Sequence, residues 1–335
     1  MNRLPPPYGR RIDRSRPLHF RFEGRAITGY AGDSIASALA ANGQWMLSRS
    51  FKYHRPRGAM SFAGTDANTL VQVDGMPNVA ADLTPLCDGM EITAQNVSGS
   101  LARDRDAVIG AFARFLPVGF YYRTFMGPTR SAWLKLWEPL IRAKAGLGVI
   151  APDAPELAVD KATLHCDAAV IGGGLSGLRA ALAAANDGAD VVLVDDQPSL
   201  GGQAAYAHDP AEADELAKSV AAHPSIRVWC ETVCTGLFED NWLALSRQDR
   251  LWRLRAGRVV LATGGIDQIA VFRNNDLPGI LTAGGARRLM YFHGVRPGAR
   301  VAVLAAAPEG FAVARELLAA GISVAAIIAP EGQGS

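Results

Sequence analysis

The residues of this sequence that could do chemistry gather in a glycine-rich segment and in a carboxylate downstream of it. Residues 170–177 read VIGGGLSG, and Asp195 ends the apolar stretch at residues 191–194. A strand, a glycine turn, a small-residue helix and a second strand that ends in a carboxylate together bind the ADP half of a dinucleotide. The segment therefore predicts a site for NAD or FAD.

Each glycine of this turn has its own expected task. Gly172 permits the sharp passage from strand to helix, Gly174 lets the backbone approach a pyrophosphate, and Gly177 lets the helix pack closely on the sheet. The N–H groups of Leu175 and Ser176 then point at the phosphates from the positive end of the helix dipole.

Asp195, followed by Asp196 and Gln197, is expected to face the adenine ribose and accept hydrogen bonds from its hydroxyls. Its negative charge disfavours a 2′-phosphate, so NAD is expected rather than NADP, and FAD is the alternative. A Rossmann unit that is kept only for its structure is the competing interpretation.

Three later segments resemble the corresponding parts of two-dinucleotide flavoproteins. They are LGGQ at residues 200–203, TV at residues 232–233 and VLATGG at residues 260–265. The resemblance implies a loop that covers the cofactor, a backbone contact to the adenine and a turn beside the cofactor. The residues that it adds to the expected binding site are Gly202, Gln203, Val233, Thr263 and Gly264.

A second, degenerate Rossmann unit is expected at residues 298–335. Its turn reads LAAAPEG at residues 304–310, so side chains stand where the backbone would approach a phosphate, and Glu309 adds repulsion. We expect a structural unit that is truncated, because the sequence ends at Ser335. A fragment or a shortened reading frame is the corresponding hypothesis.

The dinucleotide-binding domain is expected at residues 161–297, where strand and helix patterns alternate. Residues 259–262 form an apolar run that is typical of a buried parallel strand. The remaining expected elements are strands at 167–171, 191–195 and 226–230, helices at 178–187 and 211–222, a hairpin of 243–246 with 251–254, and a strand, helix and strand at 301–304, 311–320 and 324–328.

Residues 17–97 predict a small β-grasp, ferredoxin-like module. Strands are expected at 18–22, 26–30, 68–73 and 91–95, and a helix capped by Asp33 and Ser34 at 35–41. The expected fold class is thus an α/β, two-dinucleotide-binding (Rossmann-like) fold preceded by a cluster-free β-grasp module.

Residues 98–160 predict a helical connector, interrupted at Pro117, Pro128 and Pro139 and followed by a boundary at residues 152–155. Its aromatic and aliphatic side chains are expected either to pack on neighbouring parts of the chain or to form a docking surface for another subunit.

Composition limits the classes of function. The 335 residues carry a net charge of +2 with 49% hydrophobic residues, which argues against nucleic-acid or membrane-surface binding. Residues 1–16 lack the apolar core of a secretory signal, and no apolar run spans a bilayer, so a cytoplasmic protein is expected. The four cysteines, Cys87, Cys166, Cys230 and Cys234, are too scattered for a disulfide framework or a zinc site.

From about residue 17 the chain resembles the α subunit of heterotetrameric sarcosine oxidase and the related amino-acid dehydrogenases and hydrogen cyanide synthases. Besides the glycine turn, the resemblance rests on RSFKYHRPRG at 49–58, PNV at 77–79, DG at 88–89 and NNDLPG at 274–279. It implies an NAD-binding and assembly subunit with β, γ and δ partners, in a complex that also holds FAD and FMN. The implied reaction is oxidative demethylation of sarcosine to glycine at a flavin with the β subunit, with tetrahydrofolate as an acceptor of the one-carbon unit.

Relatives with a [2Fe–2S] cluster place cysteines directly after the RPRG segment, whereas residues 59–68 contain none, so we expect no Fe–S cluster. The basic segment itself is either an interdomain loop or a contact with a partner subunit or anionic cofactor. No catalytic residue is assigned, because His54 and His293 qualify by residue type alone. The alternatives are an FAD-binding subunit of an amino-acid dehydrogenase and a non-catalytic scaffold or decayed fragment.

Overall fold

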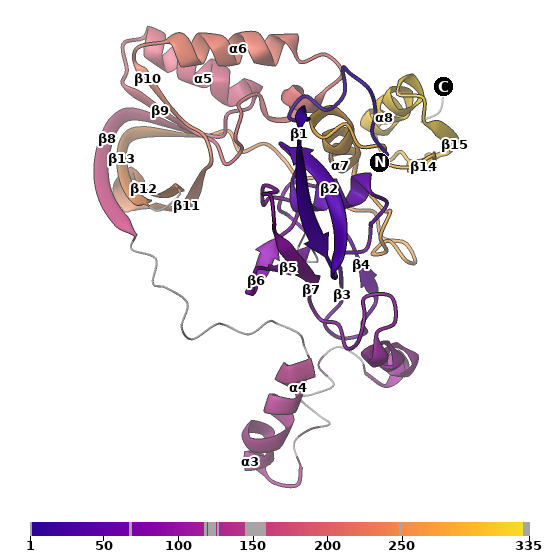
Figure 1. The fold of residues 1–335 in the computed structure, drawn as a ribbon. Coiled ribbons are helices and arrows are strands. Elements are labelled where there is room, and N and C mark those ends of the chain that lie inside the picture. Colours follow the sequence, from indigo (N-terminus) through magenta and orange to yellow (C-terminus); the bar gives the residue numbers. More distant parts are fainter. Residues whose placement is uncertain are drawn as a thin grey trace. The chain divides into compact units, whose positions relative to one another are not determined.

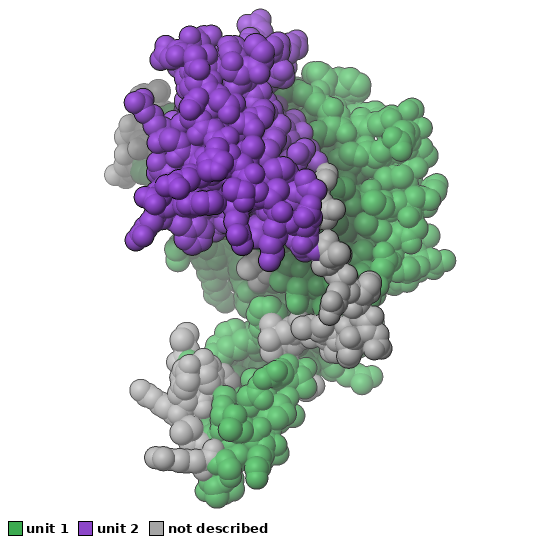
Figure 2. Space-filling view, turned by 90° about the vertical axis from the view of Figure 1, so that its left-hand side faces the viewer, with its two compact units in different colours: residues 1–154, 267–335 green, residues 155–266 purple. Residues whose placement is uncertain are grey.

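The computed structural model describes residues 2–66, 69–116, 119, 125, 127–144, 159–247 and 250–330. It divides into two compact units (Figures 1 and 2). Unit 1 comprises residues 1–154 and 267–335, and unit 2 comprises residues 155–266. Within the described part of the chain, no helix has the length and apolar character needed to cross a membrane.

Unit 1 contains a five-stranded sheet in the order β2-β1-β7-β5-β6. β1 pairs antiparallel with β2 through the turn at Glu23 and Gly24 and parallel with β7, which is the arrangement predicted for a β-grasp module. Helix α1 lies entirely in the core, and Ser34 and Ser37 close its first turn with a capping box. The bounds are β1 Asp13–Phe22, β2 Arg25–Ala31, α1 Ile35–Ala41, β5 Leu70–Val73, β6 Met76–Ala80 and β7 Glu91–Ala94.

The basic segment forms a short antiparallel hairpin, β3 (Ser48–Arg49) with β4 (Pro56–Arg57). After it, η1 (Arg105–Phe115) is a 3₁₀ helix, and α3 (Arg130–Ala132), η2 (Trp133–Trp137) and α4 (Glu138–Lys144) form one helical run. Pro139 does not interrupt this run, because a π-helical turn, in which the Glu138 amide donates to the Trp133 carbonyl, precedes it. The expected break at Pro117 and the expected boundary at residues 152–155 lie outside the described residues.

Residues 267–297 group with unit 1, although the sequence placed them in the dinucleotide-binding domain. The reason is burial, because Leu289 and Val295 pack into the core beneath the five-stranded sheet. These residues form α7 (Ala283–Arg287) and η5 (Arg288–Phe292). Unit 1 also holds the predicted strand, helix and strand of the second Rossmann-like unit, which are β14 (Arg300–Leu304), α8 (Pro308–Ala319) and β15 (Ser323–Ile328).

Unit 2 is built on a six-stranded sheet in the order β10-β9-β8-β13-β12-β11. The first four strands are parallel, and β12 and β11 extend the sheet as antiparallel neighbours. One face of the sheet packs on apolar residues of α5 and α6. On the other face, side chains of β8, β9, β12 and β13 form a second core. The bounds are β8 Asp160–Ile171, α5 Leu175–Asn186, β9 Val191–Val194, α6 Ala211–Ala222, β10 Ile226–Trp229, β11 Thr232–Phe238, β12 Trp242–Arg247 and β13 Arg250–Leu261.

The expected hairpin strand at 251–254 and the expected buried strand at 259–262 are one continuous strand, β13. The expectation of burial is wrong at its end, where Leu261 is 62% exposed. The physical reason is pairing, since β12 accompanies only residues 250–255 of β13 and leaves the rest of the strand with β8 as its neighbour.

Candidate dinucleotide site

The glycine turn joins β8 to α5 and is too tight to admit side chains at two positions. Gly172 has a φ of 107°, and a Cβ placed there would lie 2.2 Å from the Ala262 carbonyl oxygen. A Cβ on Gly177 would lie 1.8 Å from the Gly172 carbonyl oxygen. These contacts explain why the strand, the turn and the helix can approach each other only with glycine in both places.

Gly174 differs from these two glycines because a Cβ at this position would meet no close contact among the described residues. It caps the N-terminus of α5, and among the described residues the nearest neighbour of a Cβ on Gly174 would be the Gly202 Cα, at 3.9 Å. No described side chain caps this helix end, and its first turn contains no acidic residue. The amides of Leu175 and Ser176 belong to this turn, where helix geometry leaves N–H groups for an anion.

Asp195 is buried beside the turn and positions it. Its carboxylate accepts hydrogen bonds from the Gly173 amide at 2.5 Å and from the Gln197 amide at 2.8 Å. A carboxylate has about four lone-pair sites, and these two hydrogen bonds use one on each oxygen. Asp196 is exposed and accepts a hydrogen bond from the Gln197 side chain at 3.2 Å.

The loop after β9 lies against the glycine turn. The Gly201 amide donates to the Gly173 carbonyl at 2.8 Å, and a Cβ on Gly202 would lie 2.8 Å from the Gly174 Cα. The Gln203 side chain donates to the Gly265 carbonyl at 3.2 Å, which links this loop to the residues after β13. The loops that follow three neighbouring parallel strands therefore converge, as they do at the ligand-binding edge of doubly wound sheets.

The other expected residues lie near the same edge. Leu261 is paired with Ile171, so Thr263 and Gly264 follow β13 at the level of the glycine turn. The Thr232 amide donates to the Asp195 carbonyl at 3.0 Å, which places Val233 next to the carboxylate loop.

Two contacts of the site were missed by the sequence reasoning. Ala262 faces Gly172, and the Leu200 side chain closes over Gly173, where a Cβ would lie 2.5 Å from its Cδ2. Leu200 belongs to the LGGQ segment and Ala262 to the VLATGG segment. The sequence therefore indicated both segments but not the contacts that these two residues make with the glycine turn.

The two histidines that the sequence singled out lie in unit 1 and outside this site. The His54 ring contacts Asp104 at 2.6 Å. Burial lowers the pKa of His293 to about 4, so its ring is neutral near pH 7.

Two family models match the chain. Residues 167–265 match the family described as FAD dependent oxidoreductase, and residues 15–97 match the 2Fe-2S iron-sulfur cluster binding domain. The first match covers the glycine turn, the Asp195 loop and β13. The second covers the five-stranded sheet.

Curated relatives include sarcosine oxidase α subunits. The protein of Rhizobium meliloti (strain 1021) is 39% identical over 95% of this chain and 34% of its own length, and that of Corynebacterium sp. (strain P-1) is 28% identical over 95% and 31%. The chain thus spans about a third of the length of these relatives. The resemblance that the sequence motifs predicted is confirmed.

Among solved structures, L-proline dehydrogenase from P. horikoshii aligns with a TM-score of 0.69 and 24% identity, over 96% of this chain and 55% of that chain. This similarity supports the predicted fold, in which a β-grasp module accompanies a Rossmann-like unit.

The comparisons correct the cofactor prediction. The sequence reasoning excluded an iron–sulfur cluster, and this exclusion is wrong, because the family matched at residues 15–97 is a 2Fe-2S cluster-binding domain. Cys87, which is exposed, is the one cysteine in this range, so residues 15–97 supply one of the four thiolates that a [2Fe–2S] cluster usually takes.

Proposed function

We propose that unit 2 binds the ADP half of a dinucleotide and that the chain serves in a flavin-dependent amine oxidoreductase complex. The observation that carries the proposal is the open space beside Gly174, at a helix N-terminus that no described side chain caps and that the loops after β9 and β13 approach. The similarity to sarcosine oxidase α subunits and the FAD dependent oxidoreductase match support the same assignment.

NAD is the first candidate for this site and FAD the second. The buried carboxylate of Asp195 favours free ribose hydroxyls over a 2′-phosphate, which selects NAD over NADP. The family matched at residues 167–265 favours FAD, which shares the same ADP half. When bound, either cofactor supplies the capacity to accept a hydride.

The residues of the chain bind and orient this cofactor. The first-turn amides of α5 would hold the pyrophosphate, and the Asp195 carboxylate would hold the ribose. Gly202 and Gln203, in the loop against the turn, would cover the cofactor. Thr263, Gly264 and Val233 line the remaining edge. We therefore assign these residues a role in holding the cofactor, and we assign none of their side chains a proton transfer.

For the complete protein, we propose oxidative demethylation of sarcosine to glycine, with flavin chemistry in a partner β subunit and with γ and δ subunits in the assembly. The proposal rests on the similarity to sarcosine oxidase α subunits, a name that implies further subunits. Co-expression with candidate partner subunits and measurement of sarcosine-dependent oxygen consumption tests it. Turnover of another amino acid without turnover of sarcosine would favour an amino-acid dehydrogenase instead.

The nucleotide itself can be identified directly. One portion of the purified full chain is denatured in acid, and the released material is separated by chromatography against NAD, NADP and FAD. A second, folded portion is freed of bound nucleotide by dialysis and titrated with each. Release or tight binding of NAD supports the first candidate, and FAD supports the second. A chain that neither releases nor binds a dinucleotide contradicts the proposal and favours a structural scaffold.

A further inference from the structure

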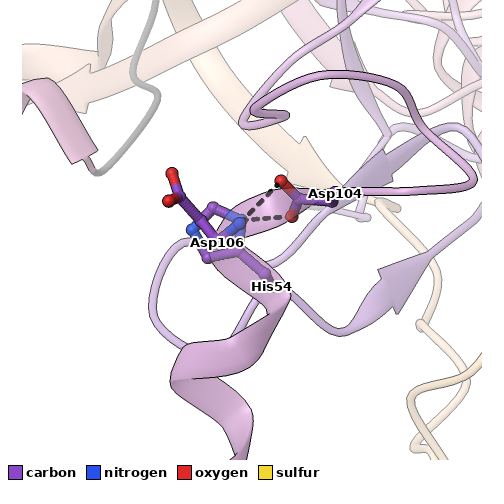
Figure 3. Close-up of side chains that lie close together, drawn as sticks. All are labelled: His54, Asp104 and Asp106. Carbon is purple, nitrogen blue, oxygen red and sulfur yellow. Dashed lines mark hydrogen bonds and ion pairs between the residues drawn. The ribbon is translucent and has the colours of Figure 1, made fainter.

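Three side chains in unit 1 form a cluster outside the dinucleotide site (Figure 3). His54 lies in the turn between β3 and β4, whereas Asp104 and Asp106 lie at the start of η1. One ligand atom from each side chain lies within 4.8 Å of the others. The cluster therefore joins two segments that are about fifty residues apart in the sequence.

Asp104 is held in place by several groups and orients the histidine. Its Oδ2 lies 2.6 Å from the His54 Nδ1, and both side chains are buried, with exposures of 0% and 2%. Its Oδ1 accepts the Ser98 amide at 2.8 Å and the Asp106 amide at 3.3 Å. The Arg49 Nε lies 3.7 Å from Oδ2 and offsets the charge of this carboxylate.

The second nitrogen of the ring has no such contact. The Nε2 of His54 is buried without a hydrogen-bond partner among the described residues. In the tautomer whose Nδ1 donates a proton to Asp104, Nε2 carries the lone pair that a metal ion would take. A histidine whose other ring nitrogen is fixed by a carboxylate is the usual form of a metal-binding histidine.

We propose that His54 and Asp106 bind a divalent transition-metal ion of the Zn²⁺ class, with Asp104 as the carboxylate that orients the ring. Figure 3 shows the Asp104 and Asp106 side chains on different sides of the His54 ring, so the two carboxylates take separate roles. Asp106 is only partly buried, which leaves coordination positions for water.

Charge and ligand type select the ion. Arg49 offsets the charge of Asp104, and the proposed ligand atoms are a carboxylate oxygen of Asp106 and the Nε2 of His54. One imidazole nitrogen with one carboxylate oxygen suits Zn²⁺, Co²⁺ or Fe²⁺, whereas Mg²⁺ and Ca²⁺ prefer oxygen ligands alone. The ion would fasten the β3–β4 hairpin to η1. This proposal does not depend on dinucleotide binding.

The test is a titration of the full, chelator-treated chain with Co²⁺, followed by visible absorption, and then displacement by Zn²⁺. We expect d–d bands that saturate at a single equivalent, disappear on addition of Zn²⁺ and persist in excess Mg²⁺. Asp106→Asn should weaken Co²⁺ binding at least about 10-fold, and Asp104→Asn about 10- to 100-fold. His19→Gln, at an exposed histidine that contacts Thr28, is the matched control and should bind as the wild type does.

Folding of each variant is checked by circular dichroism and by the unfolding temperature in chelator. Each variant is compared with itself in chelator and in Zn²⁺, and added Zn²⁺ should raise the unfolding temperature of the wild type and of His19→Gln but not that of Asp106→Asn. The proposal is overturned if the wild type shows no d–d bands, if the bands carry the intense charge transfer of thiolate ligands, or if Asp106→Asn binds Co²⁺ with unchanged affinity.

Discussion

The Arg55 guanidinium donates two hydrogen bonds to the Asp276 carboxylate, from Nε to Oδ2 and from Nη2 to Oδ1, each 2.8 Å long. These residues are 221 positions apart and belong to two of the segments that carried the sequence resemblance. Arg57 adds a contact of 2.6 Å to the same carboxylate. The basic segment and the NNDLPG segment are thus bound to each other within unit 1.

Replacing this carboxylate should destabilise unit 1. Asp276→Asn leaves two guanidinium groups around a neutral amide, and we expect a loss of about 1–2 kcal/mol in the free energy of unfolding after allowance for solvent screening. Denaturant unfolding measures it. Glu91→Gln, in the exposed pair with Arg21 at 3.4 Å, is the control and should cost less than about 0.5 kcal/mol.

The same pair predicts an acid dependence. The hydrogen bond from Arg55 lowers the pKa of Asp276 from 3.8 to about 2. Because the folded-state pKa is depressed, the stabilisation is fully present above pH 3.8 and is lost as the pH falls towards 2. The stability difference between the wild type and Asp276→Asn should shrink across this range, and a constant difference would contradict the assignment.

Gly177→Ala should destabilise unit 2 by about 2–3 kcal/mol, because the new Cβ would overlap the Gly172 carbonyl oxygen. Gly265→Ala is the matched control, since a Cβ there meets nothing within 4 Å. Its effect should stay within about 0.5 kcal/mol. Equal stability of the two variants in denaturant unfolding would show that α5 does not pack on the turn as described.

Asp195→Asn should damage both the turn and the cofactor site. In the wild type, the Gly173 and Gln197 amides each donate to a carboxylate oxygen of Asp195. Asparagine would place its NH₂ group, which is a donor, opposite one of these two N–H donors. We expect a loss of about 1–3 kcal/mol in stability and a fall of at least about 10-fold in dinucleotide affinity. Calorimetric titration and denaturant unfolding measure the two effects, and unchanged affinity would remove Asp195 from the ribose site.

His293 predicts a loss of stability in mild acid. Burial lowers its pKa from 6.5 to about 4, and Asp33, Arg3 and Arg11 surround it. Because the folded ring stays neutral while the unfolded ring is protonated, stability should be complete above pH 6.5 and should fall by up to about 3 kcal/mol as the pH approaches 4. His293→Gln should flatten the stability profile between these values, and an unchanged slope would assign it to other groups.

Local patterns predicted the fold where they were unambiguous. Helices at 35–41 and 211–222 have the predicted bounds, because a capping serine or an acidic first turn marked their starts. The single strand β13 was missed, since its two apolar runs are joined by Arg255, Ala256, Gly257 and Arg258, which look like a break. The parallel pairing with β8, which extends from Arg250 to Leu261, shows that these residues form one strand.

Contacts distant in the sequence could not be predicted. Nothing in a single sequence pairs Arg55 with Asp276, and nothing showed that Leu289 and Val295 complete the core of the β-grasp module. Similarly, the glycine motif indicated the positions of the site, whereas the hydrogen bond from the Gly173 amide to Asp195 required the folded sheet.

The most direct test of the central claim is the dinucleotide affinity of Gly174→Val, measured by calorimetric titration beside the wild type. The backbone at Gly174 is extended with a φ of −74°, so valine fits the fold and should cost less than about 1 kcal/mol as a poorer helix cap. Its side chain would occupy the space beyond the α5 N-terminus. We predict a loss of dinucleotide affinity of at least about 100-fold in a folded variant. A folded Gly174→Val chain that binds NAD and FAD as the wild type does would contradict the account.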